Sequence, residues 1–119
     1  MIATALVALV ALIHLAILAM EMLLWETRPV RALFGISPDF AVNTRVMAAN
    51  QGLYNGFLAA GLLLALWRGL PGPGAELACF ILACVIVAGL YGAATASRRI
   101  LFIQAVPALL ALLAVLTGI

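Results

Sequence analysis

Residues 2–25 read IATALVALVALIHLAILAMEMLLW, an apolar run that only Thr4, His14 and Glu21 interrupt. The hydrocarbon core of a bilayer is about 30 Å thick, and an α-helix of about 20 residues crosses it. The run is too long for a signal peptide, lacks a basic segment before it and carries an acid near its end. We therefore interpret it as a membrane-spanning helix.

Three more apolar runs follow, over residues 46–67, 75–95 and 100–119. Ser37 offers an N-cap hydroxyl, Pro38 suits the first helical position, and Asp39 places an acid at the positive end of a helix. The second helix is therefore expected to begin near Pro38. Between Pro29 and Phe34 we expect a short interfacial helix that Gly35 stops. We predict an all-α protein with a single membrane domain over residues 1–119, a four-transmembrane-helix bundle with helices at about 2–25, 38–67, 75–96 and 100–118.

The composition of the whole chain agrees with this prediction. Of its 119 residues 68% are apolar and 8% are charged, whereas a soluble domain carries about 25% charged residues. So few polar groups cannot cover the surface of a soluble enzyme. The chain also lacks the basic stripe that a nucleic-acid partner requires. The expected partner is the lipid bilayer.

The arginines are distributed unequally among the connections between the runs. The second connection carries only Arg68, whereas the first and third together carry Arg28, Arg31, Arg45, Arg98 and Arg99. Basic residues are concentrated in cytoplasmic loops. We therefore predict a multi-pass protein of the cell inner membrane, with the first and third loops in the cytoplasm and both termini extracytoplasmic.

Polar residues gather at one depth of the predicted bundle. Glu21, Asn50, Tyr91 and Gln104 each lie four residues from the cytoplasmic end of a run, and Asn55 and His14 lie deeper. At 1.5 Å per residue the shared layer lies roughly 6 Å below the interface and His14 roughly 16 Å below it. Such residues are costly in lipid, so we place them around a cytoplasm-facing cavity with His14 at its floor.

Helical spacing and small residues support this arrangement. His14, Glu21 and Trp25 fall on one stripe, Gln51 shares a face with Asn55, and Asn50 shares one with Tyr54. The small residues Gly52, Gly56 and Ala60, and likewise Gly89 and Ala93, are expected to let neighbouring helices approach closely. Pro107 is expected to kink the last helix beside Gln104.

Two segments carry a family resemblance. Residues 50–61, NQGLYNGFLAAG, and residues 84–93, CVIVAGLYGA, resemble the signature of a small bacterial and fungal membrane family, domain of unknown function 1304. His14, the Glu21-Met22 pair, Trp25 and the segment from Gln104 to Pro107 also fit its pattern. The resemblance covers nearly the whole chain and implies a four-helix inner-membrane protein, but no reaction.

The function that we favour is a membrane-embedded, isomerase-like enzyme that moves a proton on a small lipid-soluble molecule. Glu21 would be the catalytic acid or base, helped by His14, a set of residue types similar to that of membrane sterol isomerases. The substrate-binding residues would be Trp25, Asn50, Gln51, Tyr54, Asn55, Tyr91 and Gln104. One histidine and one interior glutamate are too few ligands for a metal site, and we expect no cofactor.

Two alternatives remain open. The first is a proton-coupled small-molecule transporter, because the length of the chain and the acid in its first helix resemble small multidrug resistance transporters. A chain of four helices would have to form a homodimer to build a transport path. The second is a structural membrane subunit, in which Glu21 reaches water along its stem, His14 is simply hydrogen-bonded, and the amides hold helices together for about 0.6 kcal/mol each.

Overall fold

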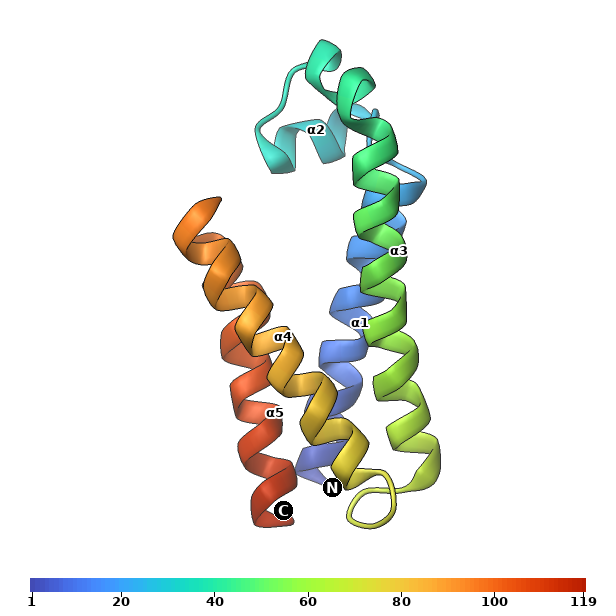
Figure 1. The fold of residues 1–119 in the computed structure, drawn as a ribbon, viewed down its shortest axis with the longest axis vertical. Helices are drawn as coiled ribbons and strands as arrows, with labels where there is room; N and C mark the ends of the chain where they lie inside the picture. The colour runs from blue at the N-terminus through green and yellow to red at the C-terminus, as the bar shows by residue number, and fades with distance from the viewer. The chain divides into compact units, whose positions relative to one another are not determined.

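The computed structural model describes all residues from 1 to 119, and the chain forms helices and their connections only. In chain order the elements are α1 (Ile2–Met22), α2 (Arg28–Phe34), α3 (Pro38–Arg68), α4 (Ala75–Thr95), the π-helical segment η1 (Leu101–Ala105) and α5 (Val106–Thr117), which Figure 1 shows. The predicted all-α class is confirmed. The chain divides into two units, the first formed by residues 1–13 and 58–119 and the second by residues 14–57.

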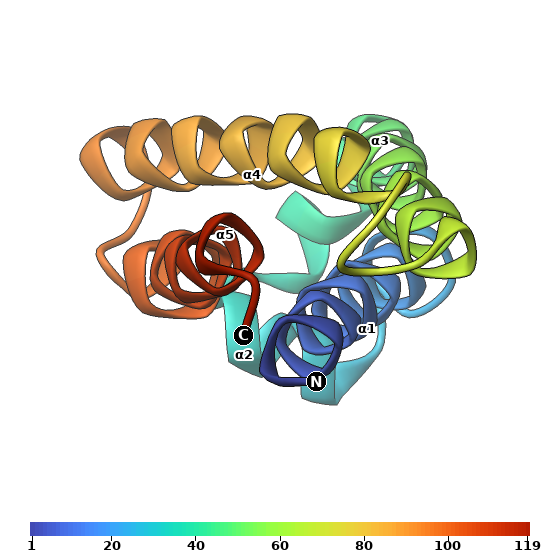
Figure 2. The same cartoon turned by 90° about the horizontal axis from the view of Figure 1, so that it is seen from below.

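The first unit has a continuous apolar core. Within it α4 and α5 lie side by side (Figures 1 and 2), and the chain ends close to its beginning, where the amide of Ala3 donates to the carbonyl of Ile119 at 2.9 Å. Four helices contribute fully buried side chains to this core: Val7, Val10, Ala11, Leu62, Ala65, Ala78, Leu82, Val85, Ala108 and Ala111. These side chains pack against one another in the interior of the unit.

The last predicted helix is divided in the structure. Instead of one helix over about 100–118, residues 101–105 form η1 and α5 begins at Val106, whose amide donates to the carbonyl of Leu101, five residues earlier. Pro107 has no amide hydrogen to donate to the preceding turn. The wider π-turn accommodates that missing bond, and Gln104 lies within it, so the expected irregularity takes the form of a π-helix.

The second unit contains the end of α1, all of α2 and the beginning of α3. The predicted start of α3 is confirmed, because α3 begins at Pro38 and the amide of Phe40 donates to Oγ of Ser37 at 3.1 Å. The predicted short helix is also present as α2. It ends at Gly35, whose φ of 66° lies in the left-handed region that glycine adopts without strain.

Helix α1 ends at Met22, three residues before the end of its apolar run at Trp25. Thr27 turns the chain here, since its amide and its hydroxyl both donate to the carbonyl of Leu24, at 3.0 and 2.6 Å. A hydroxyl that bonds to nearby backbone competes with helical hydrogen bonds. The apolar run continues to Trp25 although the helix ends at Met22, so the length predicted for α1 from hydropathy is three residues too long.

Two helices, α1 and α4, combine the length and the hydropathy needed to cross a bilayer, with 21 residues each. Helix α3 is longer, with 31 residues, but Asn50, Gln51 and Asn55 lower the hydropathy of its middle. Helix α5 has only 12 residues because η1 precedes it. The count of four membrane-spanning helices therefore stays a prediction.

Candidate functional site

A hydrogen bond between α1 and α3 lies at the centre of the second unit. Nδ2 of Asn55 donates to Oε1 of Glu21 at 2.9 Å and also to the carbonyl of Gln51, one turn earlier in α3, at 3.0 Å. Both Glu21 and Asn55 are half-buried. The bond to its own helix fixes the orientation of the amide, so Asn55 presents a donor in a defined direction to the carboxyl group.

Two glycines allow α1 and α3 to come this close. A Cβ atom on Gly52 would lie 2.6 Å from Cγ of Met22 and 3.2 Å from the carbonyl oxygen of Leu18. On Gly56 it would lie 2.6 Å from Cδ1 of Leu18. The predicted close approach along this glycine face is confirmed. Gly52 is the stricter position because it meets backbone, whereas Gly56 meets the end of a flexible side chain.

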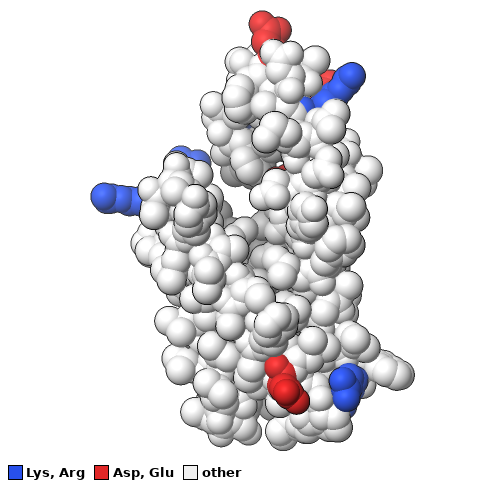
Figure 3. All heavy atoms as spheres, viewed as in Figure 1, with Lys and Arg blue, Asp and Glu red and all other residues white.

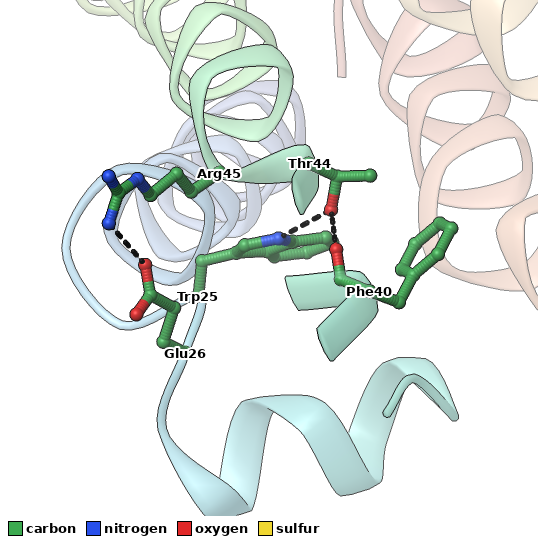
Figure 4. Close-up of polar contacts among 5 residues, drawn as sticks. All are labelled: Trp25, Glu26, Phe40, Thr44 and Arg45. Carbon is green, nitrogen blue, oxygen red and sulfur yellow. Dashed lines mark hydrogen bonds and ion pairs between the residues drawn. The ribbon is translucent and has the colours of Figure 1, made fainter. Parts of the chain in front are cut away.

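Trp25 is held in place by contacts from α2 and α3, and Figure 4 draws the contact from α3. Its Nε1–H donates to Oγ1 of Thr44 at 3.1 Å, and the Thr44 hydroxyl donates in turn to the carbonyl of Phe40 at 2.6 Å. The ring of Phe34 packs against the indole edge to face, with centroids 5.0 Å apart. These contacts restrict the indole, so Trp25 forms a fixed wall of the site.

An ion pair joins the segment that follows α1 to α3. Nη1 of Arg45 lies 3.7 Å from Oε1 of Glu26, and Figure 4 shows the two side chains beside Trp25. Both side chains are exposed, so water screens their attraction and the pair contributes little, at most about 1 kcal/mol. Its importance is that Arg45 is directed to Glu26, and the chain offers no ion pair to Glu21.

Two open clefts surround these residues, and both lie entirely in the second unit. Glu21, Trp25, Val46 and Asn50 line both of them. The first, of about 640 Å³, adds Met22, Leu23, Glu26, Thr27, Arg45 and Ala49. The second, of about 570 Å³, adds Phe40, Thr44, Met47, Ala48 and Gln51. Volumes of this size accommodate a small organic molecule.

The structure thus brings together five of the predicted site residues: Glu21, Trp25, Asn50, Gln51 and Asn55. The amide nitrogen of Asn50 donates to the carbonyl of Val46 in its own helix, at 2.8 Å, which leaves its oxygen and its second N–H for a bound molecule. The clefts have no group of three or more His, Cys, Asp or Glu side chains that could hold a metal ion.

The other four predicted site residues are not among those that line the clefts. His14 is two turns before Glu21 on α1, only 1% exposed, and lines neither cleft. Tyr54 is 59% exposed and packs edge to face on Phe57, with ring centroids 5.8 Å apart. Tyr91, which is 72% exposed on α4, and Gln104 in η1 belong to the first unit. A contribution of these four residues to ligand binding or catalysis stays a prediction.

Thr44 and the Glu26–Arg45 pair are site residues that the sequence interpretation missed. Thr44 lies in the predicted helix over 38–67 but before its apolar run, seven residues before Gln51 and eleven before Asn55. That spacing places the three on one helical stripe, so extending the polar face of α3 toward its start would have found Thr44. No comparable pattern marks Phe34, because its contact with Trp25 depends on how α2 folds back.

Comparison with known proteins gives one match. No curated protein and no solved structure matches the chain. A family model described as "Protein of unknown function (DUF1304)" matches residues 8–116. The match includes every predicted site residue, from His14 to Gln104. Because it covers nearly the whole sequence, the chain belongs to the DUF1304 family of proteins of unknown function.

Proposed function

We propose that the chain is a multi-pass inner-membrane protein with four membrane-spanning helices, and that the clefts of its second unit open toward the cytoplasm. The length and hydropathy of α1 and α4 support this, as do the large apolar side chains that α4 exposes, such as Phe80 and Val87, each 66% exposed. Figure 3 shows that most of the visible face carries no charged atoms. Water would disfavour such a surface and lipid would not.

We further propose that the clefts bind a small lipid-soluble molecule on which Glu21 performs a proton transfer. The observation that carries this proposal is the Asn55–Glu21 hydrogen bond at 2.9 Å, on a carboxyl group that lines both clefts. Asn55 engages Oε1, and Oε2 receives no hydrogen bond from the protein. One oxygen therefore positions the carboxyl group while the other is available to a substrate.

The proposed reaction is an isomerisation by general acid–base catalysis. Oε2 of Glu21 takes a proton from a carbon next to a carbonyl group, the double bond shifts, and the same oxygen returns the proton to another carbon of the substrate. The substrate keeps its composition and the enzyme is regenerated. The side-chain amide of Gln51 could donate to the substrate carbonyl oxygen, and the fixed indole of Trp25 provides an apolar wall.

A proton-coupled transporter that acts as a homodimer is the second candidate. It is favoured by the open form of both clefts, which leaves the carboxyl group of Glu21 accessible from outside the protein. A carboxyl group that exchanges a proton with water could alternate between a proton and a bound molecule. The transporter and the enzyme therefore share the site and differ in whether the bound molecule changes chemically.

One preparation tests both candidates. The full chain is reconstituted in lipid vesicles with β,γ-unsaturated ketones in deuterated water, and conjugated product and deuterium uptake are followed by absorbance and NMR. General acid–base catalysis is worth about 10²- to 10⁴-fold, so Glu21→Gln should lower the rate by at least about 100-fold. The control is Glu76→Gln, an exposed acid in the first turn of α4, which should leave the rate unchanged.

The same vesicles carry a pH-sensitive dye in their lumen. If the ketone causes proton movement but no product forms, and Glu21→Gln abolishes that movement, the protein is a transporter and not an enzyme. If none of the β,γ-unsaturated ketones gives product or proton movement, both candidates fail, and the role of a structural membrane subunit remains.

A further inference from the structure

The second cleft, which we name the Trp25 cleft, has an unusual combination of lining groups. Its only charged side chain is Glu21. Trp25 and Phe40 supply two aromatic rings, and the remaining polar side chains, Thr44, Asn50 and Gln51, are neutral. No arginine or histidine lines it. A molecule that enters this cleft therefore meets one carboxyl group among aromatic, apolar and neutral polar groups.

The charge of Glu21 is not matched by a basic side chain. Arg45 lines only the first cleft, and its guanidinium group lies 3.7 Å from Glu26. Asn55 donates one neutral hydrogen bond to the carboxyl group. When Glu21 is ionised, the Trp25 cleft thus carries an uncompensated negative charge, and a partly buried charge attracts an opposite charge more strongly than one in water.

Trp25 adds a second element of recognition. The Thr44 hydroxyl and the Phe34 ring hold the indole in place before anything binds, so little conformational freedom is lost when a molecule stacks on it. Trp25 follows Glu21 by four residues, just beyond the end of α1, and both line the Trp25 cleft. A positive group over an indole face is attracted by the ring quadrupole, and tryptophan is the strongest aromatic partner for such a group.

We propose that the Trp25 cleft binds an organic cation with apolar substituents, either a quaternary ammonium or a protonated lipid-soluble amine. The carboxyl group of Glu21 faces its charge and Trp25 stacks on its substituents. This inference rests on the proposed small-molecule site at Glu21 and names its ligand class. It holds for an enzyme and for a transporter, because it concerns recognition and not the subsequent step.

The test compares two molecules of the same shape. Trimethylphenylammonium and tert-butylbenzene differ only in that a positive nitrogen replaces a quaternary carbon. The full chain with Trp67→Phe has Trp25 as its one tryptophan, so quenching of its fluorescence in detergent reports binding at the cleft. We expect the cation to bind at least about tenfold more tightly than the neutral compound, the scale of a partly desolvated cation–π and charge interaction.

Variants then assign the preference to the residues named. Glu21→Gln should weaken binding of the cation about tenfold and leave binding of the neutral compound unchanged, whereas Glu76→Gln should affect neither. Because Trp25 is the fluorophore, Trp25→Leu is measured by calorimetry, with Trp25→Phe expected to restore part of the affinity. Helix content by circular dichroism confirms that each variant is folded.

Three results would overturn the inference. Equal affinities for the two compounds, both lost in Trp25→Leu, would exclude a cation as the ligand class while leaving the cleft and the proposed function intact. A preference for the cation that survives Glu21→Gln would place the recognition of charge elsewhere. No binding of either compound would show that the Trp25 cleft does not take molecules of this class.

Discussion

A side chain on Gly89 would meet the backbone of Ala105, since its Cβ would lie 2.9 Å from the Ala105 nitrogen and 3.2 Å from its Cα. Backbone cannot rotate away as a side chain can. We expect Gly89→Val to lower the free energy of unfolding by about 2 kcal/mol, in the range of overpacked cores. The matched control is Ala88→Val, on the exposed face of the same turn. Equal midpoints in denaturant titrations of the two variants would contradict close packing of α4 on η1.

The Asn55–Glu21 hydrogen bond can be measured separately from the proposed chemistry. Asn55→Ala removes the one hydrogen bond between side chains of α1 and α3 and should cost about 1 kcal/mol of unfolding free energy. Asn50→Ala is its control, because Asn50 bonds only to its own helix. A double-mutant cycle of Asn55→Ala with Glu21→Ala, which removes the acceptor, isolates the interaction. A coupling energy of zero would mean that the two side chains do not meet in solution.

At the level of elements, the start of α3 rests on one side chain. The hydroxyl of Ser37 accepts from the amide of Phe40 at 3.1 Å, and nothing else in the chain replaces it. Ser37→Ala should therefore cost about 1 kcal/mol and shift the unfolding midpoint downward. Ser37→Asn keeps an acceptor at the same place and should unfold close to the original protein. If both variants unfolded alike, the cap would contribute nothing.

Signals that are local in sequence were sufficient to predict some element ends and not others. The Ser37-Pro38-Asp39 start and the Gly35 stop were predicted because a cap uses atoms within a few residues of each other. The end of α1 was predicted three residues late, because hydropathy does not register the turn that Thr27 makes. Pro107 predicted a kink in the last helix, and the structure forms a π-turn there, in η1.

At the scale of the whole molecule, the polar layer predicted much of the candidate site. Glu21 and Asn50, at matched depths on two helices, line the same clefts, and Asn55, which lies deeper, reaches Glu21. Depth alone does not determine which direction a side chain takes around a helix. For this reason it could not predict the Trp25–Thr44 contact, which requires the connection through α2 to fold back on α3.

Orientation in the membrane is the prediction that concerns the chain as a whole. Five arginines lie in the first and third connections and one, Arg68, in the second, so both termini should be outside the cytoplasm. A phosphatase that is active only outside the cytoplasm should be active when fused after Gly72 or Ile119, and inactive after Arg99. A fluorescent protein that folds only in the cytoplasm should give the reverse pattern. Fluorescence from the fusion after Ile119 would invert the orientation, and the clefts beside Glu21 would then open to the opposite side of the membrane.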